Sequence, residues 1–181
     1  MPFSISRGMN TLAPKKAIYD RFMRSGKRGL KLLVVTDLDP MGDTIAEDLV
    51  KSFRRDFGLE NIEAFKVALT IDQVERFGLQ PSMDAKESSP TYAAYVAKYG
   101  DRLRELLSLS QDDPIPAFEL EAMDPGDLAN ELREAIIDVL DIDLYNQELE
   151  AEEKDSSQII AIQQQATEFF KTLKLDEDQA T

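Results

Sequence analysis

The chain has 181 residues, a formal net charge of −14, and neither cysteine nor histidine. Without these two residue types it cannot form disulfides, thiolate nucleophiles or histidine general bases, so any catalysis would use carboxylates, lysine, arginine, tyrosine or serine, with a metal ion as the natural assistant. Hydrophobic residues make up 43% of the chain, as in a globular protein. We find no apolar run long enough for a membrane span and no signal peptide, which predicts a cytoplasmic protein.

The charge is unevenly distributed. Residues 1–31 carry a balance of +7, so the remainder carries −21. An acidic protein is repelled by a polyanion at long range, so any contact with DNA should lie on the basic N-terminal segment. The alternative is that these basic residues are solvated charges on a helix face.

The N-terminal residues predict a strand, a turn and a helix. Residues 2–6 form a short apolar segment typical of a strand, and Arg7 and Gly8 follow as a turn. Thr11 can cap a helix that carries Pro14 in its first turn and ends at Ser25 and Gly26.

The most informative stretch is residues 32–44. A β-branched apolar run predicts a strand buried on both faces of a parallel sheet, and it ends in Asp37 and Asp39. Side chains at i and i+2 point to the same side of a strand, so both carboxylates should project from the carboxyl end of the strand, where open α/β sheets bind ligands. Two adjacent carboxylates favour a cation between them, and Mg²⁺, or Mn²⁺ in its place, is the natural candidate. The alternative is that one Asp caps the next helix while the other is solvated.

A helix and a second strand follow. Thr44 and Glu47 have the spacing of a capping box, with Asp43 as a second candidate N-cap. Apolar residues then recur every four positions up to residue 57, and Gly58 is placed to end the helix. Residues 62–68 predict the next strand, which gives the β-α-β order of a parallel sheet.

The next part of the chain predicts two helices separated by a loop. Residues 70–77 indicate a short helix ended by Gly78. The polar loop 79–89 carries Lys86, which could approach a phosphate or be an ordinary solvated lysine. Ser89 and Pro90 then open a helix that Tyr99 and Gly100 are placed to close, with a further helical piece at 101–108.

Residues 115–121 alternate well enough for a last strand. Glu119 and Glu121 would share one face of it, either as outer acidic ligands or paired with basic groups. Residues 128–140 predict a helix. Residues 141–181 form an acidic, Gln-rich extension with one amphipathic helix from about residue 159 to 173, which could dock on its own domain, on a partner or on a second copy, so a homodimer is possible. We therefore expect an α/β domain over residues 1–140 and a helical extension over 141–181.

The Asp-x-Asp-Pro-x-Gly pattern of residues 37–42 resembles the TOPRIM domain, in particular the version in the A subunit of topoisomerase VI and its bacterial or mobile-element relatives. Three further segments resemble parts of that domain in the same order: residues 5–12, 67–74 and 118–125. The resemblance therefore covers roughly residues 2–140. The resemblance implies a Rossmann-like parallel sheet flanked by helices and Mg²⁺-dependent cleavage or transesterification of nucleic-acid strands.

The resemblance also implies roles for individual residues. Asp37 and Asp39 would hold Mg²⁺, Arg7 beside the Gly8 turn would contact phosphate, and Gly42 would let the backbone approach the ligand. The resemblance implies a site of three carboxylates. The first of them would be a Glu on a preceding strand, and no residue in 1–36 matches it. The expectation is therefore that the chain is the C-terminal part of a longer protein, that it works with the missing N-terminal region or a partner subunit, and that the isolated chain is inactive.

Two alternatives belong to other functional classes. One is a non-catalytic interaction module on the same fold, which would bind a partner through its acidic face or C-terminal helix. The other is a phosphatase-like hydrolase with Asp37 as nucleophile. Both stay open at the level of the sequence.

Overall fold

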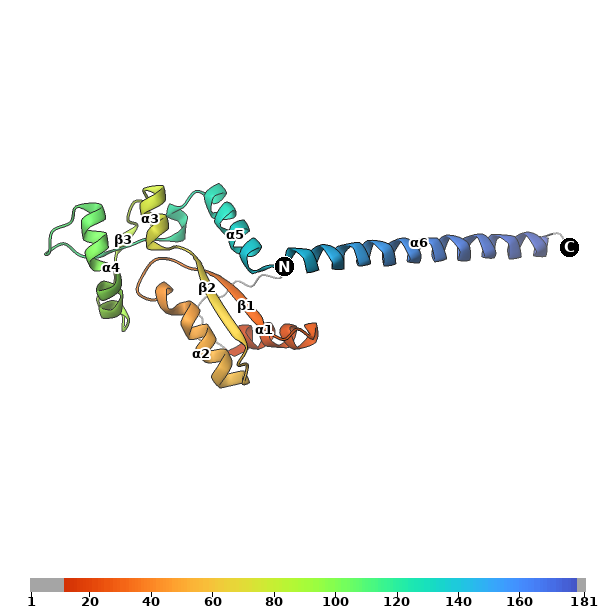
Figure 1. The fold of residues 1–181 in the computed structure, drawn as a ribbon, viewed down its shortest axis with the longest axis horizontal. Helices are drawn as coiled ribbons and strands as arrows, with labels where there is room; N and C mark the ends of the chain where they lie inside the picture. The colour runs from red at the N-terminus through yellow and green to blue at the C-terminus, as the bar shows by residue number, and fades with distance from the viewer. Residues whose placement is uncertain (1–11, 179–181) are drawn as a thin grey trace. The chain divides into compact units, whose positions relative to one another are not determined.

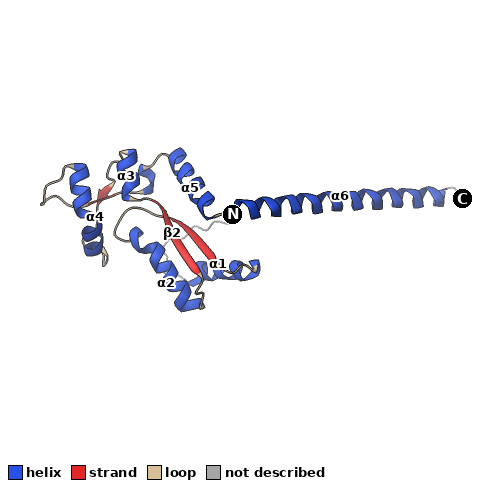
Figure 2. Cartoon of the chain, in the orientation of Figure 1, coloured by secondary structure: helices blue, strands red, loops and turns tan. Residues whose placement is uncertain are grey.

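The computed structural model describes residues 12–178 and divides into two units, the first ending at Ile136 and the second beginning at Ile137 (Figure 1). The division lies close to the predicted boundary after residue 140. The protein is mixed α/β and mostly helical, as the predominance of helix in Figure 2 shows. The predicted strand at residues 2–6 and the turn at Arg7 and Gly8 lie outside the described residues.

The first half of unit 1 is a β-α-β arrangement preceded by a helix. It comprises α1 (Leu12–Ser25), β1 (Leu30–Val35), α2 (Ile45–Phe57) and β2 (Ile62–Ala68). β1 and β2 are parallel and run side by side, with Leu30 opposite Ile62 and Val34 opposite Lys66 (Figure 1). The register shifts before Val35, which pairs with Ala68. The predicted β-α-β order with parallel strands is therefore confirmed. The expected larger sheet is not found, because among the described residues the parallel sheet has only these two strands, and β1 is mostly half-buried and not buried on both faces as predicted.

One face of this strand pair packs against α2 because β1, α2 and β2 all turn apolar side chains toward each other. The buried residues of this α2 cluster are Val34, Ala46, Leu49, Phe53 and Ile62. α1 joins it through Ile18 and Tyr19, and the Tyr19 ring stacks on Phe57 with 4.8 Å between centroids. Gly58 ends α2 with φ +65°, as predicted.

The predicted capping box at the start of α2 is wrong. Thr44 has φ −92° and ψ −13°, so it lies within a helical turn and not in the extended conformation of an N-cap. A 3₁₀ turn, Gly42–Thr44, precedes α2, and the Thr44 hydroxyl donates to the Met41 carbonyl at 3.1 Å. The Asp43 side chain does not cap the helix and instead binds α4.

The second half of unit 1 contains α3 (Ile71–Phe77), β3 (Met83–Asp84), α4 (Tyr92–Leu107), β4 (Pro116–Ala117) and most of α5 (Pro125–Val139), whose last residues belong to unit 2. Thr70 and Gln73 cap α3 reciprocally, and Gly78 ends it. The predicted end of the next helix at Gly100 is wrong, because α4 runs through Gly100 to Leu107. Gly100 is buried inside the helix, and Ser108, at φ 55°, is the left-handed residue that ends it.

The predicted strand over residues 115–121 is largely absent. Only Pro116–Ala117 forms a strand, antiparallel to β3, and Phe118 pairs with Leu38 on its other side. The chain then turns into a 3₁₀ helix, Leu120–Ala122, so Glu119 and Glu121 do not share a strand face as predicted. Here the Leu120 N–H donates to the Asp37 carboxylate and the Ala122 N–H donates to the Glu119 carbonyl, so these donors make side-chain and turn contacts in place of strand pairing.

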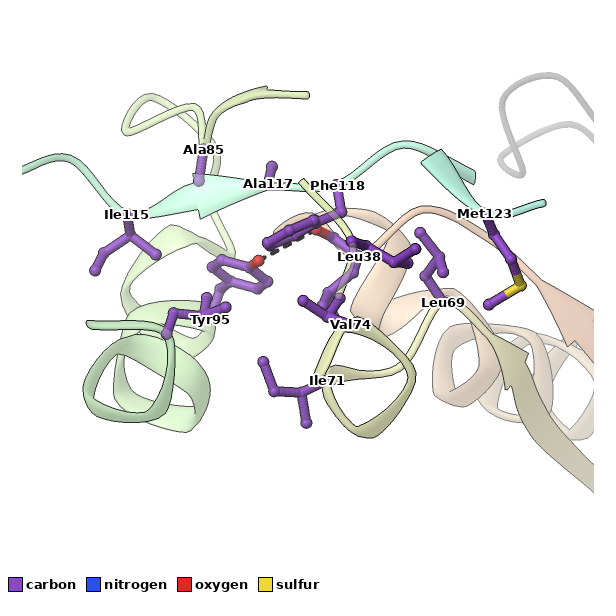
Figure 3. Packing of buried hydrophobic residues seen from close by; sticks show 12 residues of the cluster. Leu38, Leu69, Ile71, Val74, Ala85, Tyr95, Ile115, Ala117, Phe118 and Met123 are labelled. Atoms are coloured by element: carbon purple, nitrogen blue, oxygen red, sulfur yellow. Dashed lines mark hydrogen bonds between the residues drawn. The ribbon is translucent and has the colours of Figure 1, made fainter. Parts of the chain in front are cut away.

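The main core cluster of unit 1 joins these segments around Tyr95, Leu38 and Phe118 (Figure 3). Leu38, Leu69, Leu103 and Phe118 are fully buried in it. Leu38 therefore anchors the chain between Asp37 and Asp39 in the core.

Unit 2 is dominated by α6, which runs from Ile142 to Asp178 and is longer than the predicted helix at 159–173. No proline or glycine interrupts residues 141–181, and all residues from 141 to 168 are exposed. None of the helices within residues 12–178 combines the length and apolar character needed to cross a bilayer.

Candidate functional site

A pocket lies at the carboxyl end of β1, where the sequence predicts the site. It has a volume of about 230 Å³, and three chain segments contribute its lining: Asp37, Asp39, Pro40 and Met41; Met83, Asp84, Ala85, Lys86 and Ser89; and Ala117, Phe118 and Glu119. This is smaller than the roughly 300–1,000 Å³ of pockets that hold drug-sized ligands. Its size suits an ion with its water molecules or a phosphate group.

The two predicted carboxylates both line this pocket, and each is held by a backbone N–H. Asp37 Oδ1 accepts from the Leu120 N–H at 2.8 Å, and Asp39 Oδ1 accepts from the Gly42 N–H at 2.5 Å. Asp39 thus also caps the turn that follows it, which was part of the alternative interpretation. In the part of the chain that the structure describes, both hydrogen bonds use Oδ1, which leaves Oδ2 of each residue for a ligand.

Gly42 is required by the chain's own packing. A Cβ atom at this position would lie 2.3 Å from the Asp37 carbonyl oxygen and 3.1 Å from Asp39 Oδ1. The Thr36 hydroxyl also donates to the Gly42 carbonyl at 2.9 Å. The sequence predicted a glycine that lets the backbone approach a ligand, whereas the close approach in the structure is to the backbone of Asp37.

Lys66 is a polar residue of the site that the sequence reasoning missed. Its Nζ donates to the Asp37 carbonyl oxygen at 2.8 Å. Burial lowers the pKa of Lys66 to about 8, while the nearby carboxylates of Asp43 and Asp39 oppose that shift. The signal was present, because alternation along β2 places Lys66 on the same face as Ile62 and Ala64, toward α2.

Asp43 connects the same loop to α4. Lys98 Nζ lies 2.9 Å from Asp43 Oδ2, and the Tyr99 hydroxyl donates to Asp43 Oδ1 at 2.6 Å. Burial, together with the hydrogen bond to Asp43, raises the pKa of the Tyr99 hydroxyl. Tyr95 belongs to the main core cluster, and Tyr92 and Tyr99, which share its helix, pack against that cluster.

The structure brings some of the other predicted residues to the pocket. Lys86, which is exposed, and Glu119 line it together with Asp37 and Asp39. Glu121 is exposed on the following 3₁₀ turn and is not part of the lining. Arg7 and Gly8 lie outside the described residues.

The donor set fits a magnesium ion that keeps much of its water. Within residues 12–178, no group of three or more Asp, Glu, His or Cys side chains is arranged to hold a metal ion. Two carboxylates with one oxygen each to offer match the way Mg²⁺ binds through one or two carboxylates plus water or phosphate oxygens. The residues present therefore suit a weak site and not a closed cage.

Comparison of the chain with models of known families, with curated proteins and with solved structures gives no match.

Proposed function

We propose that unit 1 is a TOPRIM-like domain whose pocket binds a divalent cation together with a phosphate group of a nucleic-acid backbone. The observation that carries the proposal is that Asp37, Asp39 and Lys86 line one pocket at the carboxyl end of a parallel strand. Carboxylates suit the cation and a lysine suits the phosphate. This combination of charges around a small pocket is what a metal-phosphate ligand requires.

The chain's own residues would divide the work as follows. Asp37 and Asp39 would hold the cation through the oxygens that their backbone contacts leave available. Lys86 would orient the phosphate, and Ser89 offers a hydroxyl from the same wall. A divalent cation, when bound, supplies positive charge that stabilises the charge developing on phosphate oxygens. Asp84 and Glu119 also line this pocket, so the third acidic residue would be one of these two.

The metal site can be tested by titrating ¹⁵N-labelled protein with Mn²⁺ and observing paramagnetic broadening. We expect broadening of residues 37–43 at roughly millimolar metal, because Mg²⁺-type ions give up water reluctantly to two ligands. The double variant Asp37→Ala, Asp39→Ala should lose it. A matched control is Glu148→Ala, Glu150→Ala, which removes two exposed acidic residues of the same spacing from α6 and should retain it. Broadening that spares residues 37–43 would refute the proposal.

The nucleic-acid contact is proposed for the basic N-terminal segment. Arg21 and Arg24 of α1 are exposed, and none of the ion pairs among the described residues uses them. Charge reversal of both to Glu should weaken binding of a fluorescent DNA duplex at low salt, whereas Lys154→Glu on α6 should change it little. Equal DNA binding by the wild type, the Arg21→Glu, Arg24→Glu variant and Lys154→Glu would show that α1 does not contact the DNA. A cytoplasmic location and a homodimer stay predictions from the sequence.

The same pocket allows a test of the hydrolase alternative. Beryllofluoride with Mg²⁺ mimics a phosphorylated aspartate, so a stable complex that depends on Asp37 would favour a phosphatase-like enzyme over a nucleic-acid enzyme. If neither metal nor beryllofluoride binds, the non-catalytic interaction module is favoured.

A further inference from the structure

α4 holds the loop that carries the two carboxylates. The Thr91 hydroxyl donates to the Pro40 carbonyl at 2.5 Å, and the Tyr95 hydroxyl lies 3.1 Å from the Leu38 carbonyl. Lys98 and Tyr99 bind Asp43. Thr91 directly precedes α4, and Tyr95, Lys98 and Tyr99 lie on one face of the helix, so the start and this face of α4 contact the loop from Leu38 to Asp43.

Tyr95 differs from the other three residues because it is buried and reaches two segments of the pocket. Its side chain is 2% exposed, and its hydroxyl lies 3.0 Å from the Pro116 carbonyl and 3.1 Å from that of Leu38. Figure 3 shows Tyr95 beside Leu38 with a dashed line for this contact. Burial raises the pKa of this hydroxyl, so it stays protonated and a donor throughout the neutral range. Tyr95 therefore connects the segment of Asp37 and Asp39 to the segment of Glu119.

Those two segments also pair directly. Leu38 and Phe118 exchange both backbone hydrogen bonds, at 2.9 and 3.0 Å. The Leu38 carbonyl thus accepts from the Phe118 N–H and also lies within reach of the Tyr95 hydroxyl. Since Leu38 stands between Asp37 and Asp39, the orientation of its peptide groups determines how the two carboxylates face each other.

We infer that Tyr95 is a positioning residue for the cation pocket, which it serves by fixing the Leu38 carbonyl from the core side. This inference rests on the proposed function, because it concerns the geometry of Asp37 and Asp39 toward a cation. Tyr95 itself does not line the pocket. Outer partners that orient metal ligands typically change metal affinity by about 10- to 100-fold when they are removed.

The test is the dissociation constant for Mn²⁺, measured by electron paramagnetic resonance on the full chain and on Tyr95→Phe. The variant keeps the aromatic ring in the core and loses only the hydroxyl, so we expect a folded protein with a small fall in Tm. Its Mn²⁺ affinity should fall by about 10-fold. Such a fall with the fold retained would support the positioning role.

Two controls separate positioning from stability. Tyr92→Phe removes a hydroxyl from the same helix that makes no hydrogen bond among the described residues, and Ile62→Val shortens a buried side chain in the separate α2 cluster. Both should keep the affinity of the wild type, even where Ile62→Val lowers the Tm as much as Tyr95→Phe does.

Each remaining outcome is decisive. Unchanged affinity in Tyr95→Phe overturns the positioning role alone, and so does an equal loss of affinity in Ile62→Val. A Tyr95→Phe protein that is unfolded at 25 °C would make Tyr95 a determinant of the fold and would also overturn the inference. Absence of Mn²⁺ binding by the wild type overturns the proposed function, and the positioning role with it.

Discussion

Replacing Gly42 by Ala tests the tight turn that carries the two carboxylates. The added Cβ atom would lie 2.3 Å from the Asp37 carbonyl oxygen, well inside van der Waals contact, and that oxygen belongs to the backbone. Relief therefore requires a shift of the main chain, which also carries the hydrogen bond from the Gly42 N–H to Asp39. Overpacking of this kind costs about 1–3 kcal/mol, and the reduced entropy of the unfolded chain returns only about 0.4–1 kcal/mol.

The net loss should be measurable by thermal unfolding. For a chain of this size, a loss of about 2 kcal/mol corresponds to a fall in Tm of about 4–8 °C. The matched control is Gly100→Ala in α4, where the nearest atoms belong to side chains, at 3.2 Å or more, and where alanine is the better helix former by up to about 1 kcal/mol. We expect a clearly smaller effect there. A Gly42→Ala protein as stable as the wild type would refute the argument that the turn has no room for a Cβ atom.

Three further predictions concern charged residues that line the pocket or contact its lining segments. Asp39→Asn should leave the Tm in EDTA unchanged or raise it, because the amide oxygen can still accept from the Gly42 N–H while one of two neighbouring charges is removed. Asp39→Ala should lower the free energy of unfolding by about 1 kcal/mol, and a clear drop in Tm for Asp39→Asn would favour a purely structural role. Lys66→Met should stabilise the metal-free protein at pH 7. The pKa of Lys66 is lowered from 10.5 to about 8, so between these two pH values the unfolded state binds more protons than the folded state. Wild-type stability should therefore rise with pH across that window, and the advantage of the variant in urea melts should shrink; a stability difference that does not change with pH would contradict this. The chain should not nick or linearise supercoiled plasmid with Mg²⁺ or Mn²⁺ at a useful rate, because the lack of a metal ligand or an acid/base group typically costs about 10²–10⁴ in rate. Cleavage that the Asp37→Ala, Asp39→Ala variant abolishes would overturn this and point to Asp84 or Glu119 as the third carboxylate.

Local sequence patterns predicted the part of the candidate site that is formed by residues close together in the chain. A β-branched run followed by Asp37 and Asp39 was sufficient to place both carboxylates at the end of β1, because strand alternation and the β-α-β order depend on residues close together in the chain. The same kind of reasoning failed at Thr44, because Asp39 caps the preceding turn and the backbone is already helical from Gly42 onward.

The other half of the site depends on contacts that no local pattern encodes. Glu119 reaches the pocket because Phe118 pairs with Leu38 and Leu120 binds Asp37, so the chain leaves the predicted strand. The strand periodicity of residues 115–121 contained no sign of this partner. Likewise, the residue type of Gly100 alone suggests a helix end. In α4, however, Gly100 packs against Val96 and Ile115, and this tertiary packing keeps it within the helix.

The pairing of Leu38 with Phe118 also has a consequence for the order in which the protein folds. β1, α2 and β2 lie within a continuous stretch of the chain, whereas Leu120 and Asp37, which meet at the pocket, are 83 positions apart. The entropy of closing so long a loop opposes contacts of this kind until shorter-range ones have formed. The strand pair with α2 can therefore assemble before the pocket exists, and the far wall with Glu119 arrives late. A ligand of the completed pocket would recognise only the finished chain, so it would slow unfolding and leave the early steps of folding unchanged.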